Sequence, residues 1–168
     1  MISCAASLAH HGLLQSLGRL EMNDVDMGEV PSHRLVALAS CVTRSLCIQN
    51  VSGCDMVALL DSVKCRVLHI DGQKLKTEDT QALVRAMETS VVHVYIGRTK
   101  EATLDIEALT QYNHQGKCKR IQMAFEYLEP ETRDKYEEAL SNWPSPYPWR
   151  VWSRHHHHLR FLDSRISR

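Results

Sequence analysis

A short apolar alternation recurs along the chain, and this recurrence constrains the fold more than any other feature of the sequence. The central apolar residues of five such segments are separated by 26, 22, 26 and 27 residues; they are Leu20, Leu46, Leu68, Val94 and Ile121. Alternation with a period of two is typical of a half-buried β-strand. Recurrence at a period in the twenties indicates stacked similar units, because a unit this small cannot bury its apolar face alone.

After each strand-like segment the apolar period becomes helical. In the last three units a helical apolar residue follows the strand centre by 15 residues, as from Leu68 to Leu83. The sequence predicts strands over 17–25, 43–51, 65–73, 91–98 and 118–125. The expected helical stripes are Leu35, Leu38, Ala39 and Val42; Met56, Leu59, Leu60 and Val63; Leu83, Ala86 and Met87; Ile106, Leu109 and Tyr112; and Tyr136, Ala139, Leu140 and Trp143.

These patterns predict an α/β fold built as an arc of about five strand–helix units, with a parallel sheet on the concave side and helices on the convex side. The repeats occupy residues 17–143. Residues 1–16 are expected to be an N-terminal cap or incomplete repeat. Residues 144–168 are expected to be a C-terminal cap, in which 149–154 and 159–166 pair as a hairpin, while Trp143, Trp149 and Trp152 cover the open end.

Two helix starts carry chemical signals. Thr77 is followed by Glu78 and Asp79, which offers a hydroxyl cap and two carboxylates near the positive helix end. Pro130 stands where a first helical turn is expected, and there its missing N–H costs nothing.

The spacing of Leu17, Leu20 and Met22, followed by a helix, resembles a leucine-rich repeat of the ribonuclease-inhibitor-like type, over about residues 13–143. Such repeats form the sensing end of NOD-like receptors. The resemblance implies a protein-interaction module, with innate-immune or regulatory sensing as a possible setting. The chain departs from that family where an asparagine normally caps each strand turn, because the matching positions hold Val25, Val51 and Gln73.

Side chains alternate along a strand, so the pattern also predicts which residues face a partner. The expected concave rows are Arg19, Ser45, Val67, His93 and Arg120; Glu21, Cys47, His69, Tyr95 and Gln122; and Asn23, Gln49, Asp71, Gly97 and Ala124. We expect a protein partner to bind around Tyr95, His93 and His69. The full predicted site is Glu21, Cys47, His69, Asp71, His93, Tyr95, Arg120 and Gln122.

Composition disfavours two other classes of partner. Twenty basic residues balance twenty acidic ones, so the chain lacks the basic excess of a nucleic-acid binder. No run approaches the apolar length that a membrane span requires. The six cysteines form no CxxC pair, and the first residues lack the basic region of a signal peptide. We therefore expect a cytoplasmic protein with free thiols, of which Cys65 and Cys118 are buried, and without a cofactor.

Two alternatives to a binding module stay open. Cys47, His69 and Asp71 would lie close together on adjacent parallel strands, an arrangement that could activate a thiol nucleophile. No catalytic motif surrounds them, and we expect no enzymatic activity. The histidine run, His155, His156, His157 and His158, offers imidazole ligands for a metal, but its flanking arginines would repel a cation, and a polar hairpin tip is the preferred interpretation.

Overall fold

A computed structural model describes residues 2–99, 104–110, 118–125, 131, 134–136, 138 and 150–153. In this part of the chain, six strands form one open sheet in the order of the sequence, and every neighbouring pair is parallel. The strands are β1 (Leu17–Asn23), β2 (Val42–Gln49), β3 (Val67–Asp71), β4 (His93–Thr99), β5 (Arg120–Phe125) and β6 (Arg150–Ser153). The fold is therefore α/β with a parallel sheet, as the sequence predicts.

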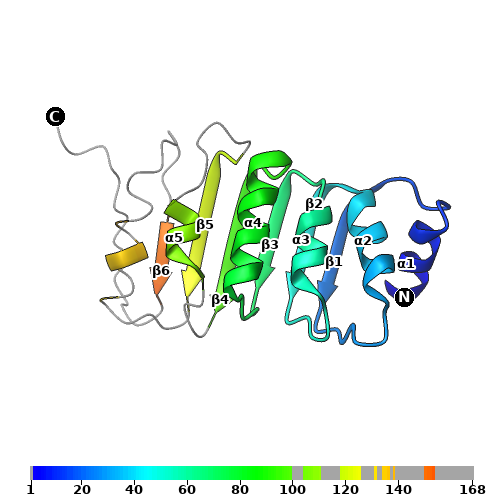
Figure 1. Cartoon of the computed structure of the whole chain (residues 1–168), viewed down its shortest axis with the longest axis horizontal. Helices are drawn as coiled ribbons and strands as arrows, with labels where there is room; N and C mark the ends of the chain where they lie inside the picture. Colours follow the sequence, from blue (N-terminus) through cyan, green and yellow to red (C-terminus); the bar gives the residue numbers. More distant parts are fainter. Residues whose placement is uncertain are drawn as a thin grey trace.

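The described helices form a single layer along one face of the sheet (Figure 1). They are α1 (Ile2–His10), α2 (Ser32–Cys41), α3 (Met56–Ser62), α4 (Thr77–Thr89) and α5 (Ile106–Thr110). Each packs against the next along the chain. The first of them, α1, lies beside α2 at the N-terminal end of the layer, within the segment expected to form the cap.

The strand register confirms the predicted rows. One row of paired positions runs through Leu20, Leu46, Leu68, Val94 and Ile121, and the next through Met22, Ile48, Ile70, Ile96 and Met123. All of these side chains are buried except Leu20, which is half-buried against the same core. The register shifts between Ile96 and Thr99, so the predicted pairing of Gly97 with Ala124 is not among the paired positions.

Most of the predicted helical stripe residues also lie in this core. The buried ones are Leu35, Leu38, Ala39, Leu59, Leu60, Leu83, Ala86, Met87, Leu109 and Tyr136, together with the thiols Cys65 and Cys118. Val42 and Val63 are buried as well, but the prediction that they are helical is wrong. The first begins β2 and the second follows the end of α3. Tyr112, Ala139, Leu140 and Trp143 lie outside the described residues.

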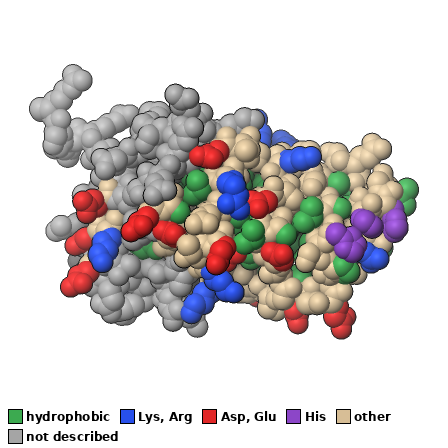
Figure 2. All heavy atoms as spheres, in the orientation of Figure 1, with side chains coloured by type: hydrophobic (Ala, Val, Ile, Leu, Met, Phe, Trp, Pro, Cys, Tyr) green, Lys and Arg blue, Asp and Glu red, His purple; other side chains and the backbone are tan. Residues whose placement is uncertain are grey.

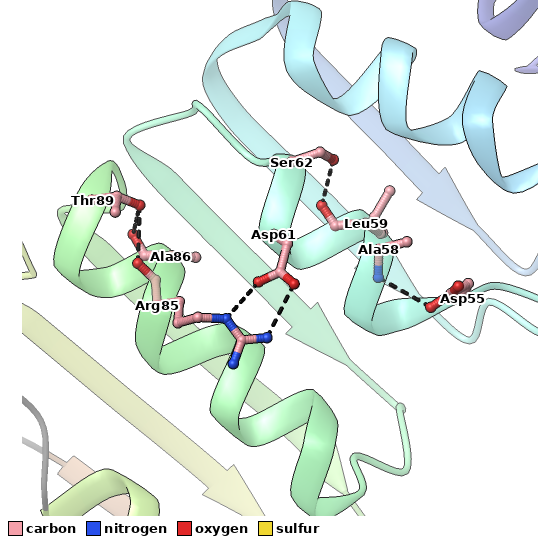
Figure 3. Close-up of polar contacts among 8 residues, drawn as sticks. All are labelled: Asp55, Ala58, Leu59, Asp61, Ser62, Arg85, Ala86 and Thr89. Carbon is pink, nitrogen blue, oxygen red and sulfur yellow. Dashed lines mark hydrogen bonds and ion pairs between the residues drawn. The ribbon is translucent and has the colours of Figure 1, made fainter.

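Carboxylates, rather than hydroxyls, cap three of the described helices: α3, α4 and α5, where Asp105 accepts a hydrogen bond of 3.1 Å from the N–H of Ala108. Figure 3 shows the first. The Asp55 side chain accepts a hydrogen bond of 3.0 Å from the N–H of Ala58 at the start of α3. At α4, Asp79 accepts one of 2.8 Å from the N–H of Lys76. The predicted Thr77 cap is wrong, because Thr77 is already the first helical residue and the cap position belongs to Lys76. Pro130 lies outside the described residues.

One ion pair joins adjacent helices on the solvent side. Arg85 of α4 donates two hydrogen bonds, of 2.9 and 3.0 Å, to the carboxylate of Asp61 on α3 (Figure 3). This forked contact raises the pKa of the Arg85 guanidinium. Both side chains are exposed, so we expect the pair to orient the two helices more than to stabilise them.

Left-handed residues end the first three strands. Asp24, Asn50 and Gly72 have φ of 51°, 47° and 65° and occupy the same place in successive turns. Because this conformation breaks the extended backbone, each of the three strands ends two residues earlier than predicted. The backbone N–H of each turn residue donates to the neighbouring strand: Asp24 to Gln49, Asn50 to Asp71 and Gly72 to Gly97.

Side-chain amides connect these turns, although the asparagine that is typical of leucine-rich repeats is missing from them. Asn50 donates a hydrogen bond of 2.8 Å to the Asp24 carboxylate. Gln73 is buried, and its amide is best oriented with the nitrogen donating to the Val51 carbonyl at 3.0 Å and the oxygen accepting from the Asn50 N–H at 3.0 Å. Gln73 therefore forms hydrogen bonds with the backbone carbonyl of Val51 and the backbone N–H of Asn50, at a turn where leucine-rich repeats normally have an asparagine.

The C-terminal segment contributes a further strand to the sheet. β6 pairs in parallel with β5 and continues the sheet as its sixth strand. The segment 159–166, its expected hairpin partner, lies outside the described residues.

Candidate binding face of the sheet

The side of the sheet opposite the helices, which we call the open face, carries the predicted site. Its two full rows are in register: Arg19, Ser45, Val67, His93 and Arg120, and then Glu21, Cys47, His69, Tyr95 and Gln122. Asp71 aligns with Gln49 on one side and Gly97 on the other. All eight predicted site residues are exposed or half-buried, in contrast to the fully buried rows that alternate with them.

A shallow hollow of about 230 Å³ lies on this face, across β3, β4 and β5. Five predicted site residues line it, namely His69, His93, Tyr95, Arg120 and Gln122, together with Val67 and Val94. Glu21, Cys47 and Asp71 do not line the hollow. Val67 is predicted in its open-face row but not in the site, because a valine in a strand carries no binding signal by itself.

A glycine shapes the middle of this face. The Tyr95 and His69 rings lie 5.7 Å apart and are tilted by 44°. A methyl group at Gly97 would lie 2.7 Å from Cε1 of Tyr95 and 3.1 Å from its hydroxyl oxygen. The tyrosine ring therefore occupies the space that a side chain at Gly97 would take. The Asp71 carboxylate borders the same space, since its Oδ1 lies 3.1 Å from that methyl position.

The surroundings of both histidines at the hollow favour the neutral imidazole. Burial lowers the pKa of His69 below 6.5, and the charge of Arg19 adds to this effect. Burial also lowers the pKa of His93, with further contributions from Arg120 and Arg66. A neutral imidazole has one donor and one acceptor nitrogen, so each ring can form hydrogen bonds of both kinds with a ligand.

The candidate nucleophile has an unfavourable environment. Cys47 pairs in register with His69, as the sequence predicts. Burial raises the pKa of Cys47, and the carboxylates of Glu21 and Asp71 raise it further, although Arg19 opposes them. A raised pKa keeps the sulfur as a thiol, whereas nucleophilic attack requires the thiolate. Cys47 in this environment is therefore a poor nucleophile.

Histidines also gather at the N-terminal end of the helical face (Figure 2). The ring centroid of His10 lies 4.7 Å from that of His33 and 5.2 Å from that of His11. Among the described residues, no group of three or more histidine, cysteine or acidic side chains could hold a metal ion. The run His155–158 lies outside the described residues.

Comparisons with family models, with curated proteins and with solved structures found no match to the chain. The likeness to leucine-rich repeats therefore depends on the sequence pattern and on the repeated strand–helix geometry described above. No helix in the described part of the chain combines the length and the apolar character needed to cross a membrane.

Proposed function

We propose that the chain is a short leucine-rich-repeat solenoid that acts as a non-catalytic interaction module and binds a protein partner on the open face. In such a solenoid the open face is the concave side, which is the usual binding surface of repeat proteins. The same proposal includes innate-immune or regulatory sensing, which the resemblance to leucine-rich repeats suggests. It also includes a cytoplasmic location, which agrees with the free cysteines.

The observation that carries the proposal is the hollow around Tyr95. It combines an aromatic ring, two neutral imidazoles, a guanidinium and an amide on the side of the sheet that no described helix covers. Tyrosine and arginine are the residue types that most often dominate binding energy at protein interfaces. The raised pKa of Cys47 beside this hollow supports binding over covalent catalysis.

The size of the face limits the partner. Six strands spaced about 4.8 Å apart span about 24 Å, and four to eight residues per strand give a mean height of about 20 Å. The resulting patch, about 480 Å², is smaller than the roughly 800 Å² that each partner of a standard stable complex buries. A loop or an extended segment of the partner fits this patch better than a broad globular surface does.

Partner capture from the native cell tests this function. The double variant Tyr95→Ala, His93→Ala should lose the captured protein, while its circular dichroism stays unchanged. A matched control, Gln81→Ala with His33→Ala, removes two exposed side chains from the helical face and should retain the partner. Equal capture by both double variants would place the binding surface elsewhere and contradict the proposal.

A further inference from the structure

Although the net charge of the chain is zero, its charges are sorted along the strands. Basic residues lie where the strands begin: Arg19, Arg44, Arg66, Lys119 and Arg120. Acidic residues lie at the ends of β1 and β3, namely Asp24, Asp26 and Asp71, whereas β4 carries Arg98 near its end. Arg19 forms an ion pair with Glu21 on its own strand, so its charge is already balanced. Among the other basic residues, Arg120 lies in a row of the open face, and Arg66 directly precedes the open-face residue Val67.

The hollow lies at this basic end. Arg120 lines it and pairs in register with His93, and the charges of both Arg120 and Arg66 act on the His93 imidazole. Neither guanidinium has an ion-pair partner among the described residues. The Nε–H of Arg120 is also shielded from solvent without a hydrogen-bond acceptor there. An arginine guanidinium without an ion-pair partner can form a charge-assisted contact with a ligand carboxylate.

The other wall of the hollow is apolar and aromatic. Val67, His69 and Tyr95 form it, and Arg120 of β5 lies next to it. A volume of about 230 Å³ suits one side chain of a ligand. An extended peptide advances about 3.3 Å per residue, so about seven residues would cross the sheet from edge to edge.

We propose that the open face binds an extended acidic segment of a protein partner, in which a glutamate or aspartate carboxylate contacts Arg120 and Arg66 while an apolar neighbour occupies the hollow. This inference rests on the proposed function, because it names the ligand chemistry of the same face. Charge complementarity selects the acidic segment over a basic or purely apolar one.

The test uses random heptapeptides displayed on phage, selected against the full chain at low salt. We expect enriched sequences to contain glutamate or aspartate next to an apolar residue. Synthetic peptides made from them should lose at least tenfold in affinity when their acidic residues are replaced by the corresponding amides. Arg120→Glu should cause a similar loss of affinity. Arg120→Gln removes the charge without reversing it and should cause a smaller loss, so it provides the test where the charge reversal disturbs folding. Lys76→Glu makes the same charge change at the opposite end of the strands and should stay within twofold of wild type.

The outcomes separate this inference from the proposed function. Enriched peptides that lack carboxylates but lose binding to Tyr95→Ala would overturn the acidic ligand and leave the binding face intact. Peptides that bind Tyr95→Ala as tightly as wild type would contradict both. A selection without enrichment would overturn the peptide inference alone, since capture of the native partner decides the function independently.

Discussion

The two faces of the same sheet follow different rules. On the helix-covered face, every described strand from β2 to β5 places a fully buried apolar residue at each core position, as at Leu46, Leu68 and Val94. On the open face, the neighbouring positions hold a thiol, an imidazole and a phenol: Cys47, His69 and Tyr95. Packing restricts the first face to apolar side chains, whereas the second can vary without loss of the fold. Within each strand, one set of alternate residues therefore stabilises the fold, while the other set is free to contact a partner.

The largest expected effect concerns the covered face. Leu68→Ala should lower the free energy of unfolding by about 2–5 kcal/mol, because Leu68 is 0% exposed and truncation leaves a cavity between sheet and helices. The His69 side chain, one residue further along β3, lies on the open face. His69→Ala should therefore lower the free energy of unfolding by less than about 1 kcal/mol. Chemical denaturation of both variants measures the contrast. Equal losses would mean that the two faces do not differ as described.

An intermediate effect is expected where the strands end. Gly72 has φ of 65°, and a methyl group there would clash with Oδ1 of Asn50. Gly72→Ala should therefore cost about 1–3 kcal/mol through backbone strain and a disturbed turn. Gly18→Ala is the matched control, because its methyl would meet only Arg44 at 3.6 Å. Thermal melting should show a clear drop for the first variant and little change for the second; similar melting would exclude a structural role for the left-handed turn position.

The smallest effect is expected on the outer surface of the helices. Arg85→Gln removes the ion pair with Asp61 and should cost at most about 1 kcal/mol, because both side chains are exposed. The coupling energy from a double-mutant cycle with Asp61→Asn should decrease as salt is added. A coupling above 2 kcal/mol would show that the helical layer depends on surface charge rather than on its buried stripe.

The sequence by itself determined the features that depend on periodicity. Alternation in the strands and the helical stripes specify the parallel units and the core rows, because a shift of one residue would expose every buried side chain. The same alternation placed His69, His93 and Tyr95 together on one face. The predictions for Val42 and Thr77 failed where periodicity ends, since the ends of helices depend on backbone conformation and local capping.

Only the tertiary structure decided the shape and the charge of the open face. The Tyr95 ring occupies the space that a side chain at Gly97 would take, and the pKa values of His69 and His93 are lowered because burial and arginines from neighbouring units act on them. The turn contacts of Asn50 likewise join residues 26 positions apart. These features arise from side-chain packing between neighbouring units, and a linear pattern records which residues alternate but not how their side chains meet.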